Sequence, residues 1–330
     1  MTDAVVVATA TELFRVSADG SSAARGEGLE GNRATGLSSD FLAPSSAWCC
    51  TDQGGVFRSD DAGATWSPAG LEGEKLMTVA ASPARPSLIW AGAEPSVVWR
   101  SDDAGGRWER PADLEVLPSS SDWAFPPRPE THHVRWVACH PADPDRVWVA
   151  IEAGALIRTH DGGRTWLDRV EGGPYDTHEL AVHRDAPDVL RVAAGDGYYE
   201  SHDGGETWSS PLDGMDVGYL RSIAVDPGDA EVVLVSAASG PRTAYVAGRS
   251  DGRLYRRRGA GRWERVVEGW PDPPGTIAPL LVAGRRAGEI WAADERGVHR
   301  SGDGGVQWRQ VWAFERTPNH LRGLIVVAAR

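Results

Sequence analysis

Several residue types that mark other protein classes are scarce in this chain. Three cysteines, Cys49, Cys50 and Cys139, cannot form the disulfide framework of a small secreted domain. Lys75 is the one lysine, and no run of basic residues could neutralise a row of phosphates. The chain has no positively charged N-terminal segment and no run of about 18 apolar residues. The sequence therefore predicts a cytoplasmic protein without a membrane span and without nucleic acid or membrane as a partner.

The composition is that of a globular protein. Of the 330 residues, 41% are hydrophobic and 25% are charged, which is enough apolar material for a sizeable core. There are 34 basic and 47 acidic residues, giving a formal net charge of −13 that also disfavours polyanionic partners. Length alone allows one domain or two, because repeat folds often exceed the typical size of about 150 residues.

A repeat with insertions organises the chain. Six tryptophans are separated by 42, 58, 42, 55 and 45 residues, and they are Trp66, Trp108, Trp166, Trp208, Trp263 and Trp308. Before each lies a version of one phrase, which reads Ser201-x-Asp203-x-Gly205-x-Thr207-Trp208 in one complete copy. Two other copies are complete, two replace only the threonine, and the copy before Trp263 has Arg258 in place of the aspartate. The phrase predicts a tight turn in which the carboxylate accepts backbone N–H groups, glycine takes a positive φ and tryptophan covers the hairpin.

Between these turns apolar and polar residues alternate, with many β-branched and aromatic side chains, as in the segment 146–150. Each unit is therefore predicted to be a four-stranded antiparallel meander. Seven units can be counted, but the first lacks an innermost strand and the last leaves an unpaired one at 321–329. Pairing of the two ends in one blade would close a ring. We expect an all-β, seven-bladed β-propeller that spans 1–330 as a single domain.

The repeated phrase resembles the Asp-box, or BNR, repeat. Similar repeats occur in sialidases, xyloglucan-cleaving glycosidases, sortilin-type receptors and photosystem II assembly factors, so the resemblance implies a fold more than an activity. The Arg-Ile-Pro motif of sialidases is absent, and xyloglucanases of this type have two propellers in tandem. The chain looks most like single-propeller bacterial BNR-like proteins, a group without a settled activity.

The first residues of the inner strands should surround one mouth of the central channel. Aligned on one another, they place His133, His178 and His320 at the first position, with arginines two residues after the first and the last of these. Because the first and third residues of a strand share a face, three imidazoles could converge there as ligands for Zn, Cu or Fe. Arg135, Arg221 and Arg322 indicate an anionic ligand. The alternatives are a polar channel that holds only ordered water, and ion pairing of the arginines with Glu152 or Glu179.

Two insertions interrupt the repeat, at 111–131 and 239–251. Both are expected at the same mouth, where they would act as lids that supply Trp123, Phe125 and Tyr245 as stacking surface for a ligand. A partner-binding loop or a merely tolerated insertion is the alternative.

These patterns support three hypotheses about function. The first is a pocket protein that binds a small polar or anionic ligand, with a divalent metal and with Glu152, Tyr219 or Glu179 as proton-transferring groups of an enzyme. The second is a non-catalytic propeller that holds a protein partner. The third is a glycan-binding or glycan-cleaving propeller, suggested by acidic strand ends at Glu94, Glu152, Asp196 and Asp294. The chain has no Gly-rich phosphate loop, so no nucleotide cofactor is expected.

Overall fold

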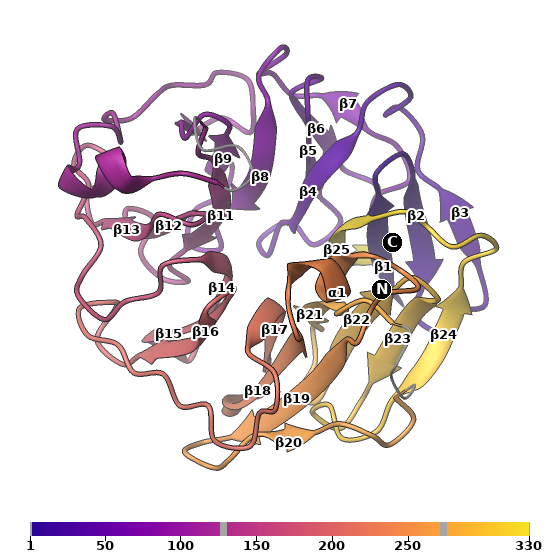
Figure 1. Ribbon diagram of the computed structural model, residues 1–330. Helices are drawn as coiled ribbons and strands as arrows, with labels where there is room; N and C mark the ends of the chain where they lie inside the picture. Colours follow the sequence, from indigo (N-terminus) through magenta and orange to yellow (C-terminus); the bar gives the residue numbers. More distant parts are fainter. Residues whose placement is uncertain (1, 126–130, 271–275, 330) are drawn as a thin grey trace.

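Seven antiparallel sheets surround a central axis in the computed structural model, which describes residues 2–125, 131–270 and 276–329 (Figure 1). The predicted all-β, seven-bladed propeller is confirmed. Among the described residues, no helix is long and apolar enough to cross a membrane.

In six blades the strands run outward from the axis in chain order, and in the seventh the order is β25, β1, β2 and β3. The inner strands are β4 (Ala34–Ser39), β8 (Leu76–Ala81), β11 (Val134–Cys139), β14 (Thr177–His183), β17 (Tyr219–Asp226), β21 (Leu280–Ala283) and β25 (Leu321–Ala329). The second strands are β5 (Ala47–Thr51), β9 (Ile89–Ala93), β12 (Val147–Ile151), β15 (Ala186–Ala194), β18 (Asp229–Ala238), β22 (Ile290–Asp294) and β1 (Thr2–Thr9). The third strands are β6 (Val56–Ser59), β10 (Val98–Ser101), β13 (Ala155–Thr159), β16 (Gly197–Ser201), β19 (Arg253–Arg258), β23 (Gly297–Ser301) and β2 (Leu13–Ser17).

The outermost strands are short. Four blades keep them as β7 (Ser67–Pro68), β20 (Glu264–Arg265), β24 (Arg309–Ala313) and β3 (Ala23–Arg25). In the other three blades the fourth strand is reduced to one bridge, at Arg100–Glu109, Arg158–Leu167 and Glu200–Ser209. Short outer strands leave little unpaired edge for other chains to join.

The two ends of the chain close the ring. Strand β25 pairs antiparallel with β1 along its whole length, so the innermost strand of the first blade comes from the C-terminal segment, as predicted. The core lies between neighbouring blades, and every residue of β5, β9, β12 and β22 is buried. Both faces of these strands are covered, which explains why they read as nearly continuous apolar runs.

The repeated phrase forms the predicted turn. The Ser201 hydroxyl accepts the N–H of Gly205 (2.8 Å), and Asp203 accepts the N–H (2.9 Å) and the hydroxyl (2.6 Å) of Thr207. Gly205 has a φ of 97°, a conformation that favours glycine. Trp208 donates its indole N–H to the Gly205 carbonyl and covers the turn. The side chains of Ser201, Asp203 and Thr207 bond to one another and to the backbone of the same turn, which indicates a structural role.

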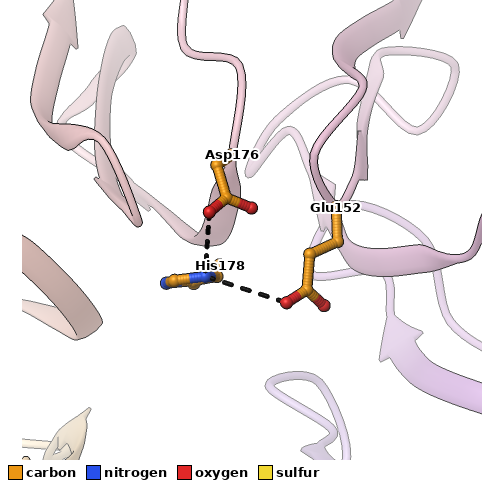
Figure 2. A group of neighbouring side chains, drawn as sticks. All are labelled: Glu152, Asp176 and His178. Atoms are coloured by element: carbon orange, nitrogen blue, oxygen red, sulfur yellow. Dashed lines mark ion pairs between the residues drawn. The ribbon is translucent and has the colours of Figure 1, made fainter. Parts of the chain in front are cut away.

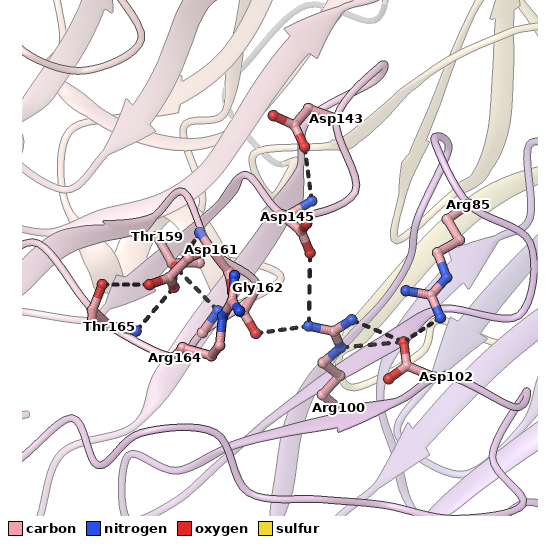
Figure 3. A network of polar contacts seen from close by, with 11 residues as sticks. Arg85, Arg100, Asp102, Asp143, Asp145, Thr159, Asp161, Gly162, Arg164 and Thr165 are labelled. Carbon is pink, nitrogen blue, oxygen red and sulfur yellow. Dashed lines mark hydrogen bonds and ion pairs between the residues drawn. The ribbon is translucent and has the colours of Figure 1, made fainter.

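Arginines of the third strands link neighbouring blades at these turns (Figure 3). Arg100 on β10 donates to the carbonyl of Gly162 in the turn of the next blade (2.8 Å) and pairs with Asp102 (3.0 Å). Arg256 on β19 makes the same link to the carbonyl of Gly304 (2.7 Å). The carbonyls of Gly162 and Gly304 are thereby satisfied across the blade boundary.

A β-bulge recurs at one position of the inner strands. In six of the seven inner strands the pairing skips one residue near the start, and these are Thr35, Met77, Arg135, His178, Arg221 and Arg322. A bulge lets two consecutive residues face the same side, which a regular strand does not. The bulges therefore decide which side chains meet at the axis.

Candidate functional site

The central channel holds a small cavity walled by the bulges. From each bulged strand the skipped residue and the one after it line the cavity, as Arg135 with Trp136 and His178 with Glu179 do. Its volume of about 70 Å³ leaves room for about five water molecules. Sites for drug-sized molecules are typically about 300–1,000 Å³, so a cavity of this size suits an ion or the head group of a ligand.

Three arginines line this cavity, and they are Arg135, Arg221 and Arg322. Arg221 is buried and donates to the carbonyls of Ala278 (2.6 Å) and Leu321 (3.0 Å), while its Nε–H has no hydrogen-bond partner among the described residues. Burial, together with the charges of Arg135 and Arg322, lowers the pKa of Arg221 to about 10. In the part of the chain that the structure describes, only Arg135 of the three has an ion-pair partner, Glu152 Oε2 at 3.5 Å. The cavity wall thus carries an excess of positive charge.

Among the described residues, Glu179 is the one carboxyl group that lines the cavity. It accepts the hydroxyl of Ser222 (2.6 Å). Burial raises the pKa of Glu179 to about 7, although Ser222 and the two nearest arginines oppose the shift. A carboxyl group with this pKa can give or take a proton at neutral pH, as the prediction of a proton-transferring role requires.

At the mouth above the cavity, three successive blades each pair a basic residue before the inner strand with an acidic residue after the second strand. The pairs are Arg33 with Asp52 (3.8 Å), Lys75 with Glu94 (2.8 Å) and His133 with Glu152 (2.6 Å). Burial opposes ionisation of Glu152, but His133 and Arg135 outweigh it and lower the pKa to about 2. In each of these three blades the acid contacts a base of its own blade.

The next blade breaks this pattern. Asp176 stands where the base would be, and Gly195 stands where the acid would be. Figure 2 shows His178 Nε2 facing both Asp176 Oδ2 at 3.7 Å and Glu152 Oε1 at 3.9 Å. These are the three residues whose ligand atoms all lie within 4.8 Å of one another. Burial raises the pKa of Asp176 and lowers that of His178.

The predicted set of three histidines is not assembled. Of the three, only His178 belongs to the group just described, while His133 donates to Glu152 and His320 is exposed beside Arg322 and Arg221. The physical reason is the bulge. The sequence analysis treated His178 as the equivalent of His133. In the structure the bulges make His178 equivalent to Arg135, and Asp176 equivalent to His133.

Of the residues predicted to move protons, Tyr219 also lies at the mouth. Its hydroxyl is 3.4 Å from His178 Nε2, and burial raises its pKa above the ordinary value. Glu152 and Tyr219 thus approach the same imidazole edge from two different blades.

Of the three aromatic residues predicted in the two insertions, two lie beside the channel mouth and one lies in the core. Trp123 follows the short 3₁₀ helix η1 (Pro118–Asp122), is only 4% exposed and packs in the core, so it does not offer the predicted stacking surface. Phe125 is half-buried with its ring 4.8 Å from that of His133. Tyr245 ends helix α1 (Pro241–Tyr245), and the Arg221 guanidinium carbon lies 4.7 Å from its ring centroid. Residues 126–130 of the first insertion lie outside the described residues.

The acidic strand ends proposed for glycan chemistry serve mainly as local partners. Asp196 accepts the Tyr199 hydroxyl (2.8 Å), and Asp294 is fully buried against Arg296 and His299. Glu152 alone of the four belongs to the group that contains a second carboxylate, Asp176.

Asp176 is the residue of this site that the sequence analysis missed. The signal was its spacing of two from His178, which places both side chains on one face of a strand end.

The fold and this channel define a class, a single seven-bladed propeller with a polar, arginine-lined axis. No protein-family model matches the chain, and no curated protein does. Among solved structures, an ancestral GH74 enzyme superposes with a TM-score of 0.65 at 15% identity, over 85% of this chain and 38% of that one. YCF48 from Cyanidioschyzon merolae gives a TM-score of 0.61 at 15% identity, over 90% of this chain and 95% of that one. YCF48 bound to D1 peptide gives 0.59 at 18% identity, over 84% and 80%.

These similarities concern the fold alone. The chain spans little more than a third of the ancestral GH74 enzyme and 53% of a second GH74 enzyme, from Niastella koreensis. The seven-bladed architecture is shared with both groups, while the naming of the repeat as an Asp-box stays a prediction.

Proposed function

We propose that this protein binds a small anion, or the anionic head group of a larger polar ligand, at the mouth of its central channel. The observation that carries the proposal is the convergence of Arg135, Arg221 and Arg322 on one cavity where a single carboxylate partner is in ion-pair reach among the described residues. Concentrating like charges in a partly buried cavity costs free energy, and a bound carboxylate or phosphate would recover it.

The free donors favour an anion over a neutral ligand. The Nε–H of Arg221 is buried and unpaired within the described part of the chain, and Arg322 is exposed at the same opening. An unmade hydrogen bond from a charged donor costs about 1.5–3 kcal/mol, which an anion would regain. Tyr245 lies over Arg221 and shields it from solvent, which strengthens such a bond.

Titration calorimetry with inorganic phosphate and with succinate, at low ionic strength and on untagged protein, tests this proposal. We expect one site per chain and a loss of affinity of about tenfold or more in Arg322→Gln, whose side chain is exposed and whose loss should not affect folding. Arg262→Gln is the matched control, because Arg262 is exposed on the outer part of a blade and pairs with Asp213. Equal binding by both variants, or no binding of either anion, would refute the proposal.

A peptide ligand is the second candidate. One solved propeller of similar architecture is YCF48 bound to D1 peptide, and this chain carries the half-buried rings of Phe125 and Tyr245 beside the mouth. Aromatic rings next to free arginines suit an acidic peptide segment. In that case a peptide with several carboxylates would bind more tightly than succinate, and Arg322→Gln would weaken both.

A further inference from the structure

Two carboxylates at the mouth each use one oxygen for anchoring and leave the other free. Asp176 Oδ1 accepts the N–H of Ala153 (3.1 Å), and its Oδ2 faces His178. Glu152 Oε2 is held by His133 at 2.6 Å and by Arg135 at 3.5 Å, and its Oε1 faces His178 from the other side (Figure 2). Both free oxygens therefore point at one imidazole edge.

That imidazole edge is also an acceptor. His178 Nδ1 lies within hydrogen-bond distance of the Leu220 carbonyl, which can only accept, so the proton of a neutral ring is on Nδ1. The ring is 2% exposed, which disfavours the charged form. Nε2 then presents its lone pair to the two carboxylate oxygens. The Tyr219 hydroxyl lies 3.4 Å from Nε2 and can donate to it, and among the described residues no lysine or arginine is in ion-pair reach of Asp176.

The neighbouring blades show that this arrangement is specific to one place. The neighbouring blades pair a base before the inner strand with an acid after the second strand. In this blade the position of the base holds an acid, Asp176, and the position of the acid holds a glycine, Gly195. A Cβ on Gly195 would lie 2.0 Å from Asp176 Oδ2 and 3.2 Å from His178 Cε1. The glycine is thus what allows the carboxylate to stand beside the imidazole.

The geometry points to a metal site: we propose that Glu152 Oε1, Asp176 Oδ2 and His178 Nε2 are ligands of one divalent first-row transition-metal ion at the mouth of the channel. Tetrahedral ligands about 2.1 Å from an ion lie about 3.4 Å apart. The two distances to His178 Nε2, 3.7 and 3.9 Å, exceed this value by about 0.3 and 0.5 Å, and the two carboxylate oxygens lie within 4.8 Å of each other. One imidazole and two carboxylates suit Zn²⁺, Fe²⁺ or Mn²⁺, whereas Ca²⁺ prefers oxygen ligands alone.

The groups that hydrogen-bond to the proposed ligands are also typical of a metal site. The Nδ1 contact to a backbone carbonyl fixes the ring orientation, and the His133 bond fixes the carboxylate of Glu152, as outer partners of metal ligands do. The inference goes beyond the proposed anion site, because it uses different side chains and needs no anion. An anion held by the arginines could nevertheless occupy an open coordination position.

Calorimetric titration of chelator-treated, untagged protein with Zn²⁺ alone tests the site, with Mn²⁺ as a second probe. We expect one ion per chain, tighter binding of Zn²⁺ than of Mn²⁺, and a rise in Tm on addition of Zn²⁺. Asp176→Asn and Glu152→Gln should each lose Zn²⁺ affinity by about tenfold or more, since each removes a charged ligand. The control is Glu94→Gln, because Glu94 follows β9 as Glu152 follows β12 but pairs with Lys75.

Circular dichroism and Tm without metal establish that each variant is folded. Zn²⁺ binding that is absent, or that is unchanged in both Asp176→Asn and Glu152→Gln, would overturn the inference, as would an equal loss in Glu94→Gln. The metal titration contains no succinate or phosphate, so its failure leaves the anion site untouched. Anion binding that fails while Zn²⁺ binds would refute only the proposed function.

Discussion

Gly195→Ala changes the metal-site geometry without changing any proposed ligand. The added Cβ would lie 2.0 Å from Asp176 Oδ2, and ordinary contact begins at 3.4 Å, so the carboxylate must move by about 1.4 Å. Asp176 can turn, because it is the end of a side chain, but it then leaves the position opposite His178. Since φ of Gly195 is not in the left-handed region, alanine brings no backbone strain.

We expect Gly195→Ala to bind Zn²⁺ about tenfold or more weakly than the wild type, as ligand displacement requires. Overpacking costs about 1–3 kcal/mol and the loss of glycine freedom in the unfolded chain returns about 0.4–1 kcal/mol, so urea unfolding should show a net loss of about 2.6 kcal/mol or less. Gly218→Ala is the matched control, because apart from its two chain neighbours no atom of the described residues lies within 4 Å of its added Cβ. Wild-type Zn²⁺ affinity in a folded Gly195→Ala variant would refute the reasoning.

Three further predictions concern the framework. Ser201→Ala removes the buried hydroxyl that accepts from Gly205, and should lower the free energy of unfolding by about 1–3 kcal/mol in urea titrations, whereas an unchanged midpoint would argue against the turn's structural role. The Thr165 hydroxyl and N–H lower the pKa of Asp161 from 3.8 to about 2, so its stabilising effect is present above pH 3.8 and is lost as the pH falls through 2. Asp161→Asn should therefore be less stable than the wild type at pH 7, with the difference shrinking between pH 4 and pH 2; a constant difference would contradict this. Burial raises the pKa of Cys50 to about 12, so a thiol reagent at pH 8 should modify it only after unfolding, as mass spectrometry of the modified peptide would show.

The sequence predicted the strands and turns of the blades better than the side chains that line the central channel. Turns such as the one from Ser201 to Trp208 can be recognised in the sequence, because each polar residue has a partner at most four residues away. The closure by 321–329 followed from counting strands against units, and the structure pairs it as expected. Such features depend on local chemistry and periodicity, which a sequence records directly.

Only part of the site was predicted. A bulge shifts the strand register, but the alternation of apolar and polar residues does not reveal where the bulge lies. Arg135, Arg221 and Arg322 were assigned to the channel wall, as the structure has them. His178 was aligned two residues away from its structural equivalent, and Asp176 was passed over for that reason. Trp123 looked like an exposed loop aromatic, but its indole donates to Ser119 and its ring packs in the core, a tertiary contact that composition does not reveal.

The recurrent bulge also affects how such a protein can change during evolution. A skipped residue has no partner in its ladder, so replacing it leaves the strand pairing of its blade intact. Two adjacent blades place uncharged Thr35 and Met77 at this position, while others place arginine or histidine there. A blade with the bulge can therefore alter the channel wall by one substitution without changing its own strand pairing, although Arg221 also donates to the carbonyls of Ala278 and Leu321. A propeller built in this way can acquire new ligands while its framework stays the same.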